Sequence, residues 1–142
     1  FEGWNDRIQL ILDLVNKDEC YRWALYTRPV IETWSTDRAT ILGDAAHATL
    51  PYLAQGAAMA VEDGAVLTRA LQLSPDIASA LMLYERNRVD RTARVVRTSK
   101  ANGGVFHQRS VADIRKSFES RDEGGDRNAW LYSYNPLTVE LV

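Results

Sequence analysis

The stretch ATILGDAAHATLPYLAQGAAMAVEDGAVL, residues 39–67, carries the clearest indications of the fold. A short apolar run, Ala39–Leu42, stops at Gly43-Asp44, and small residues follow until a second apolar pattern begins near Gly56. A run that is apolar on both faces is typical of a buried strand covered by helices. We therefore expect a strand, a tight turn, and a helix from Gly56 to about Leu73.

This turn is expected to bring a hydrogen-bond acceptor and a group of hydrogen-bond donors close together. Ligands of open α/β sheets bind beyond the carboxyl ends of the strands, where the Asp44 carboxylate can accept hydrogen bonds from hydroxyl groups. Gly43 allows a close approach of the backbone to a ligand. The free N–H groups of a helix that starts at Gln55-Gly56 form an anion site. The same residues also suit an ordinary turn with close helix–sheet packing, and the spacing alone leaves both interpretations open.

Hydrophobic periodicity predicts further elements on either side of this stretch. Three are helices, and the longest of them starts at Ser74-Pro75-Asp76 with Ser74 as its N-cap and ends before Gly103-Gly104. One is a half-buried strand, because its apolar residues alternate. The predicted ranges are a helix over Asp6–Val15 capped by Asn5 or Asp6, a strand over Tyr21–Tyr26, the long helix to about Lys100, a helix over Val111–Phe118, and a loose polar stretch over 119–128.

Composition excludes several classes of function. The chain has 142 residues and a net charge of −2, the length of about one domain without the basic excess of a nucleic-acid-binding protein. A single cysteine, Cys20, rules out an internal disulfide and a multi-cysteine zinc site, and His47 and His107 lack metal-ligand spacing. No apolar run approaches the ~20 residues of a membrane span, and no signal peptide is visible. We expect a cytoplasmic protein.

The string GDAAHATLPYLAQGAAMAVED resembles the second flavin-binding motif of the class A FAD-dependent aromatic monooxygenases, the group of salicylate, para-hydroxybenzoate and 6-hydroxynicotinate hydroxylases. A second string, YERNRVDR at Tyr84–Arg91, is similar to the family pattern Tyr-Glu-x-x-Arg-x-x-Arg, and the closing WLYSYNPLT is similar to the family's C-terminal ends. The shared features of the first motif are Gly43–His47, Pro51, Gln55-Gly56 and the acidic pair Glu62-Asp63.

The resemblance implies FAD as cofactor and NAD(P)H as co-substrate in the O2-dependent hydroxylation of an aromatic acid. By the family pattern, Asp44 binds a ribityl hydroxyl, Pro51 lies against the isoalloxazine ring, and the amides near Gly56 face its N1–C2=O edge. It identifies no catalytic residue and no metal ligand. The cofactor-binding residues that it implies are Gly43, Asp44, Pro51, Gln55, Gly56, Ala57 and Ala58.

Other polar and aromatic residues receive structural interpretations. We expect His47 to belong to the turn, with catalysis as the lesser alternative, and Glu62-Asp63 to pair with arginines. We expect Trp130, Tyr132 and Tyr134 to be packing aromatics. The long helix would carry a solvated, salt-bridged arginine face and offers a candidate interface for a homo-oligomer; its members are Arg86, Arg88, Arg91, Arg94 and Arg97.

The glycine-rich GxGxxG turn and the mid-chain Asp-Gly motif of the family are absent from this sequence. The chain therefore resembles only the C-terminal third of such an enzyme, and its main partner would be the remaining N-terminal part. The predicted fold class is α/β, mainly helical here: the C-terminal part of a Rossmann-like FAD-binding fold with a few short strands and a long C-terminal helix.

We expect residues 1–30 to end a substrate-binding domain, 31–73 to form the second half of the FAD-binding domain, and 74–142 to form C-terminal helices and a tail. Alone, the chain should neither hold FAD tightly nor turn over. Two alternatives stay open: another flavin-dependent reaction on this scaffold (epoxidation, halogenation or reduction), or a non-catalytic helical module that binds a protein partner.

Overall fold

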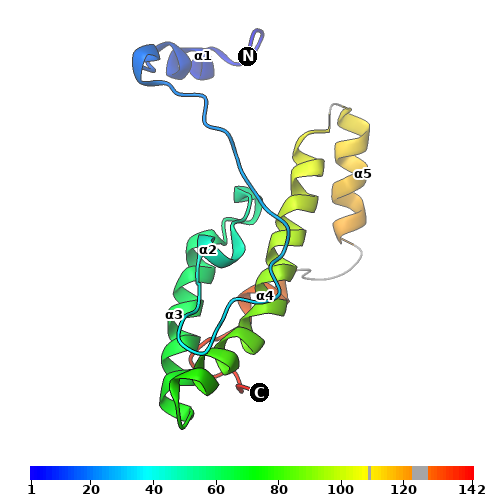
Figure 1. The fold of residues 1–142 in the computed structure, drawn as a ribbon. Helices are drawn as coiled ribbons and strands as arrows, with labels where there is room; N and C mark the ends of the chain where they lie inside the picture. Colours follow the sequence, from blue (N-terminus) through cyan, green and yellow to red (C-terminus); the bar gives the residue numbers. More distant parts are fainter. Residues whose placement is uncertain (109, 123–127) are drawn as a thin grey trace.

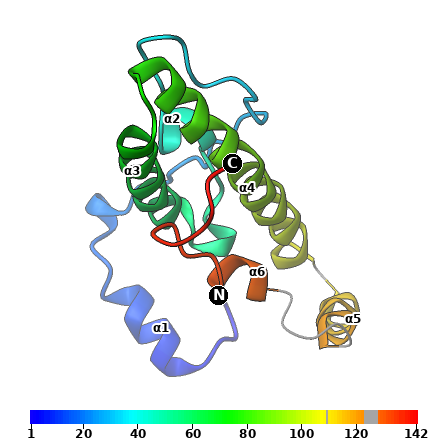
Figure 2. The ribbon, with the colours of Figure 1, turned by 90° about the horizontal axis from the view of Figure 1, so that it is seen from below.

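The computed structural model describes residues 1–108, 110–122 and 128–142. The described chain is mainly helical, and its two longest helices lie side by side as an antiparallel pair (Figures 1 and 2). In chain order the elements are α1 (Asp6–Asp13), the 3₁₀ helix η1 (Lys17–Glu19), α2 (Asp44–His47), the 3₁₀ helix η2 (Pro51–Leu53), α3 (Gly56–Leu73), α4 (Ile77–Phe106), α5 (Val111–Asp122) and α6 (Ala129–Tyr132).

The core lies along the seam between α3 and α4, because residues three and four apart on each helix share the face toward the other. One buried cluster joins this seam to the segment before the motif turn, and a second joins it to the C-terminal part. The first cluster comprises Trp34, Ala46, Val66, Ala70 and Tyr84, and the second comprises Met59, Val95 and Leu131.

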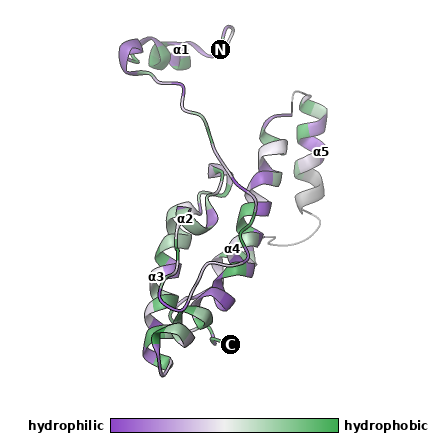
Figure 3. Ribbon diagram, viewed as in Figure 1, coloured by the Kyte–Doolittle hydropathy of each residue, from purple (hydrophilic) through white to green (hydrophobic). Residues whose placement is uncertain are grey.

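The predicted N-terminal helix is confirmed as α1. Its N-cap is Asn5, whose side chain accepts a hydrogen bond from the Arg7 amide at 3.0 Å. None of its residues is buried, although hydrophobic residues, green in Figure 3, lie along it. Leu14 is 75% exposed, and the helix stands apart from α3 and α4 in Figures 1 and 2. The apolar face predicted for α1 is therefore present but unburied within the described chain.

Both predicted strands are wrong for the described residues. Residues 20–33 are extended but form no ladder, and the side chains of Tyr21 and Trp23 are 78% and 84% exposed. The run Ala39–Leu42 contributes only an isolated antiparallel bridge between Ser35 and Thr40. A strand is completed by hydrogen bonds to a neighbour, and the described residues supply no neighbouring strand.

The boundaries of α4 differ from the prediction at both ends. Asp76, rather than Ser74, is the N-cap: its Oδ1 accepts a hydrogen bond from the Ser79 amide at 2.8 Å. The helix then passes through Gly103-Gly104 and ends at Phe106. A Cβ added at Gly103 would lie 2.6 Å from Tyr52 Cε2 in η2, so the packing at this position requires a residue without a side chain. Helix α3, in contrast, runs from Gly56 to Leu73 as predicted.

The C-terminal residues return across both long helices (Figure 2). The Arg69 guanidinium donates to the carbonyls of Pro136 and Val139 at 2.8 and 2.7 Å. Trp130 and Tyr134 pack against arginines of α4, whereas Tyr132 is 70% exposed. The predicted helix from Val111 is present and reaches Asp122, so it takes in part of the stretch expected to be loose; residues 123–127 of that stretch lie outside the described residues.

Candidate functional site

The motif turn is built around Gly43. Its φ of +58° is a conformation that favours glycine, and a Cβ placed there would lie 3.4 Å from Ala60 Cβ. The single-turn helix α2 begins directly after it, with Asp44 exposed at the first position and Ala46 and His47 buried. The turn therefore presents the carboxylate of Asp44 outward while it buries the other end of α2.

The exposed side of this turn opens on a pocket of ≈ 530 Å³. That volume lies in the range of small-molecule and cofactor sites. Its wall combines the turn, η2 and the start of α3, and mostly small or apolar side chains line it apart from one carboxylate. The lining residues are Asp44, Thr49, Leu50, Pro51, Ala54, Gly56, Ala57 and Ala60.

The chain reverses direction at the floor of the pocket. Pro51 opens η2, and Ala54 follows in the left-handed conformation with φ +52° and ψ +35°. This reversal aims the start of α3 at the pocket. The N–H groups of the first turn of α3 have no intrahelical partner and carry the positive end of the helix dipole, and no side chain caps them.

The seven residues proposed from sequence divide into two groups. Asp44, Pro51, Gly56 and Ala57 line the pocket together. Gly43 is buried behind it, Gln55 occupies the N-cap position of α3, and Ala58 is exposed outside the lining. Sequence reasoning missed Thr49, Leu50, Ala54 and Ala60; of these, Ala60 was predictable, because it lies four residues after Gly56 on the same helix face.

Behind the turn, the buried carboxylate of Asp63 connects three elements. Its Oδ2 accepts hydrogen bonds from the Gly43 amide at 2.9 Å and from His47 Nε2 at 2.6 Å. Its Oδ1 accepts from Arg88 Nε at 2.7 Å. Burial by itself raises the pKa of Asp63, but the hydrogen bonds from His47, Gly43 and Arg88 outweigh it and hold that pKa below its usual value. The prediction that His47 belongs to the structure of the turn agrees with this contact.

The arginine face predicted for α4 is only partly correct. Arg88 is fully buried between Asp63 and Glu62. Burial alone would lower the pKa of Arg88, but Asp63, Tyr134 and Glu62 outweigh it and raise that pKa above its usual value. Arg91 binds Glu62 through two nitrogens, at 2.6 and 2.8 Å, and lies over the Tyr134 ring. Arg86, Arg94 and Arg97 are the exposed members. Glu62 and Asp63 do bind arginines, as expected, but these ion pairs are buried or nearly buried rather than solvated.

The motif Tyr84–Arg91 on α4 also holds the segment that leads into the turn. The Tyr84 hydroxyl donates to the Ile41 carbonyl at 3.2 Å, and burial raises the pKa of Tyr84 far above its usual value. Glu85 Oε2 accepts from the backbone amides of Trp34 and Ser35 at 2.7 and 2.5 Å. Side chains of α4 therefore anchor the backbone at several points before the pocket.

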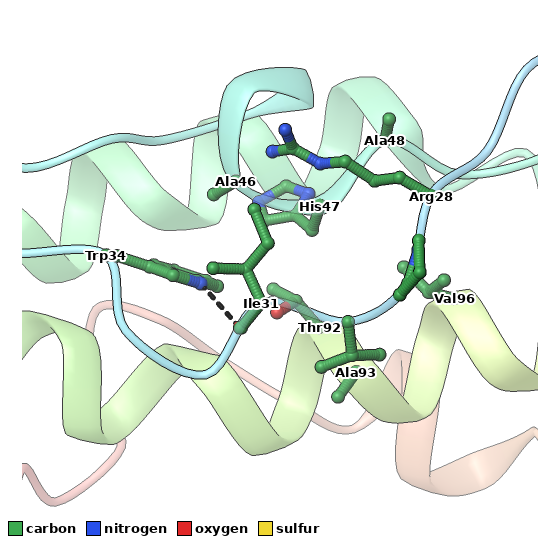
Figure 4. A pocket seen from close by; sticks show the side chains of 11 residues that line it. Arg28, Ile31, Trp34, Ala46, His47, Ala48, Thr92, Ala93 and Val96 are labelled. Atoms are coloured by element: carbon green, nitrogen blue, oxygen red, sulfur yellow. Dashed lines mark hydrogen bonds between the residues drawn. The ribbon is translucent and has the colours of Figure 1, made fainter.

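A second, much smaller cavity lies on the other side of α2 (Figure 4). Arg28 and Ile31 from the extended segment, His47 from α2, and Thr92 from α4 surround it, and its volume is ≈ 10 Å³. That is about the space of one water-sized sphere, so no organic ligand fits there. The pocket beside Asp44, at ≈ 530 Å³, does have room for a cofactor.

Within the described residues, no group of histidine, cysteine, aspartate and glutamate side chains is arranged to hold a metal ion. The helices described here include none that is long and apolar enough to cross a membrane. The chemistry offered by the site is that of hydrogen bonding: an acceptor for hydroxyl groups at Asp44, and amide donors for negative charge at the start of α3.

The chain is similar to a known protein family and to known enzymes. The family described as "FAD binding domain" matches residues 13–99. The 3-hydroxybenzoate 6-hydroxylase of Polaromonas naphthalenivorans is 39% identical over 140 residues, which cover 95% of this chain and 34% of the relative. The 6-hydroxynicotinate 3-monooxygenase of Pseudomonas fluorescens is 41% identical over 144 residues, covering 100% of this chain and 32% of the relative.

The chain is also similar to a solved structure. The crystal structure of Klebsiella pneumoniae HpxO in complex with FAD and uric acid matches with a TM-score of 0.76 and 28% identity, over 89% of this chain and 33% of that one. The chain thus spans about a third of the length of the relatives that it matches.

Proposed function

This chain belongs to the FAD-binding-domain family of flavin-dependent aromatic monooxygenases, and from that premise we propose that it forms one side of the flavin site in an enzyme that hydroxylates an aromatic acid with NAD(P)H and O2. Relatives named as hydroxylases of 3-hydroxybenzoate and 6-hydroxynicotinate support the substrate class, a small aromatic acid. Their similarity extends over nearly all of this chain.

The observation that carries the proposal is the pocket where Asp44, Pro51 and the uncapped start of α3 meet. Its residues fit the ribityl chain and the pyrimidine edge of a flavin. The carboxylate of Asp44 is exposed there and free to accept from a ribityl hydroxyl. Pro51 offers a rigid apolar surface for the ring, and the glycine and alanines of the α3 start leave its amides uncovered.

Bound FAD supplies the electron transfer and O2 activation of this class of reaction. The residues of this chain would orient the flavin and stabilise its reduced form. Asp44 fixes the sugar-alcohol chain, and the amides of Gly56, Ala57 and Ala58, with Gln55 at the N-cap, place the helix dipole where negative charge gathers on a reduced flavin. Gly43 gives the turn its shape. The proposed cofactor-binding set is therefore the one implied by the family pattern.

The proposal includes the division of the chain and its partner. Residues 1–30 would end the substrate domain, 31–73 complete the flavin domain, and 74–142 cover it as helices and tail. Exposed apolar residues of α1 and of the extended segment 20–33 support a partner surface supplied by the remaining part of the same enzyme. A cytoplasmic location is also part of the proposal, and it is in keeping with a single cysteine.

The test uses the full-length enzyme that contains this chain. Purified protein should show a flavin absorption spectrum and should oxidise NADH or NADPH faster when an aromatic acid such as 3-hydroxybenzoate or 6-hydroxynicotinate is added. Mass spectrometry should detect a product with one added oxygen atom. Protein without flavin, or NAD(P)H oxidation that never yields a hydroxylated product from a panel of aromatic acids, contradicts the proposal.

A further inference from the structure

We propose that Asp63 is the positioning residue of the flavin site: it holds both ends of α2 and thereby fixes the direction in which Asp44 meets the cofactor. The inference rests on the proposed function and adds to it a residue that does not itself line the pocket. Asp63 belongs to α3, nineteen positions after Asp44 in the chain, and its side chain is fully buried.

The geometry gives Asp63 a hold on both sides of Asp44. One oxygen of its carboxylate binds the amide of Gly43, the residue before Asp44, and also Nε2 of His47, the last residue of α2. Because α2 is a single turn, fixing both ends leaves little freedom for the residues between them. No hydrogen bond from the described residues reaches the Asp44 carboxylate itself, so its direction is set through the backbone.

The other oxygen of Asp63 is held from the opposite side. Arg88 Nε binds it at 2.7 Å, while Arg88 Nη2 lies 2.8 Å from Glu62 Oε2 and 3.3 Å from the Met59 carbonyl. A buried carboxylate requires paired cations or hydrogen-bond donors. Asp63 has three donors: the Gly43 amide, His47 Nε2 and Arg88 Nε. Asp63 is thus held in place by Arg88 on α4 and in turn holds the motif turn. The position of the turn therefore depends on how α3 and α4 pack together.

Substitution of asparagine for Asp63 distinguishes the hydrogen-bonding role of the carboxylate from the space that its side chain fills. The asparagine side chain has nearly the same shape, but one of its two polar ends is an NH2 group that can only donate. It would face donors from Gly43 and His47 or from Arg88. Asp63→Asn should therefore loosen α2 without leaving a cavity.

The decisive measurement is a double-mutant cycle on the affinity of the full-length apoenzyme for FAD. Asp44→Ala and Asp63→Asn should each weaken FAD binding about tenfold, the effect of one lost charge-assisted hydrogen bond. The double variant should bind FAD no more weakly than Asp44→Ala alone, because Asp63 acts through Asp44. Arg69→Ala is the control: it removes the hydrogen bonds from α3 to the carbonyls of Pro136 and Val139 and touches neither Asp63 nor the turn, so it should lower Tm and leave FAD affinity unchanged.

Full additivity in the cycle, or an Asp63→Asn variant with unchanged FAD affinity, overturns the positioning role while the flavin assignment stands. Unchanged affinity in Asp44→Ala refutes the flavin assignment itself, and the positioning role with it. If Asp63→Asn does not fold, His47→Leu replaces it in the same cycle. This variant removes the bond at the C-terminal end of α2 and the ring contact with Trp34 but keeps the bond from Gly43 to Asp63. The same non-additivity with Asp44→Ala is expected, and full additivity is again the contrary result.

Discussion

The ring of Tyr52 packs directly on the backbone of Gly103, so that a methyl group added to Gly103 would lie 2.6 Å from Tyr52 Cε2. Tyr52 is the residue after Pro51, in the short 3₁₀ helix that lines the pocket. The contact joins the far part of α4 to the floor of the proposed flavin site. It also explains why Gly103, inside a long helix, has no side chain.

Gly103→Ala should therefore displace Tyr52 and destabilise the full-length protein by about 1–3 kcal/mol, the usual effect of overpacking. Since Tyr52 and Pro51 are neighbours, FAD binding should weaken as well. Denaturant unfolding and FAD titration measure the two effects.

Gly104→Ala provides the matched control. A Cβ at Gly104 meets nothing within 4 Å, and alanine is the better helix former. The free energy of unfolding of this variant should therefore rise by about 0.5–1 kcal/mol. Equal behaviour of the two variants would show that the Tyr52 contact has no influence.

The start of α4 offers a second prediction. Asp76 accepts hydrogen bonds from both the amide and the hydroxyl of Ser79, and these bonds hold its pKa below the usual value. Asp76→Ala should lower Tm by a few degrees through loss of the N-cap. Ser74→Ala should leave Tm nearly unchanged, because among the described residues Ser74 bonds through its backbone amide alone, to the Ala70 carbonyl. A larger loss in Ser74→Ala would restore the cap position indicated by the sequence.

The pH dependence of stability should report on Asp63. Its pKa is lowered in the folded protein, so its stabilising contribution is complete above the unfolded value of about 4 and is lost as the pH falls through the folded pKa. The difference in unfolding free energy between wild type and Asp63→Asn should be constant from about pH 6 to pH 8 and should shrink below about pH 4. A difference that grows on acidification contradicts the ionised, hydrogen-bonded state of this carboxylate.

The isolated chain provides a fourth prediction. Large apolar side chains of α1 and of the following extended segment are exposed, including Leu14, Tyr21 and Trp23. We expect the 142 residues alone to purify without flavin and to show rapid amide exchange over residues 1–33, whereas the full-length enzyme protects these residues. Stoichiometric yellow flavin on the isolated chain would contradict this expectation.

Local features of the sequence determined much of this protein. The boundaries of α3 follow from the small residues that begin at Gly56 and from the break at Ser74-Pro75, and the Gly-Asp motif together with Pro51 indicates where the pocket lies. Such features are predictable because helix hydrogen bonds, caps and turn conformations involve residues close together in the chain.

Only the tertiary structure decided which polar residues are buried. The arginines of α4 look alike in sequence, yet Arg88 is enclosed because its face of α4 meets Asp63 on α3, while Arg94 and Arg97 face away. Likewise, Ala39–Leu42 has the composition of a strand, but the described residues offer it no neighbour to complete one. Periodicity specifies which residues share a face, but the partner of that face comes from residues far away in the chain, and it is the partner that determines whether a charge is solvated or paired.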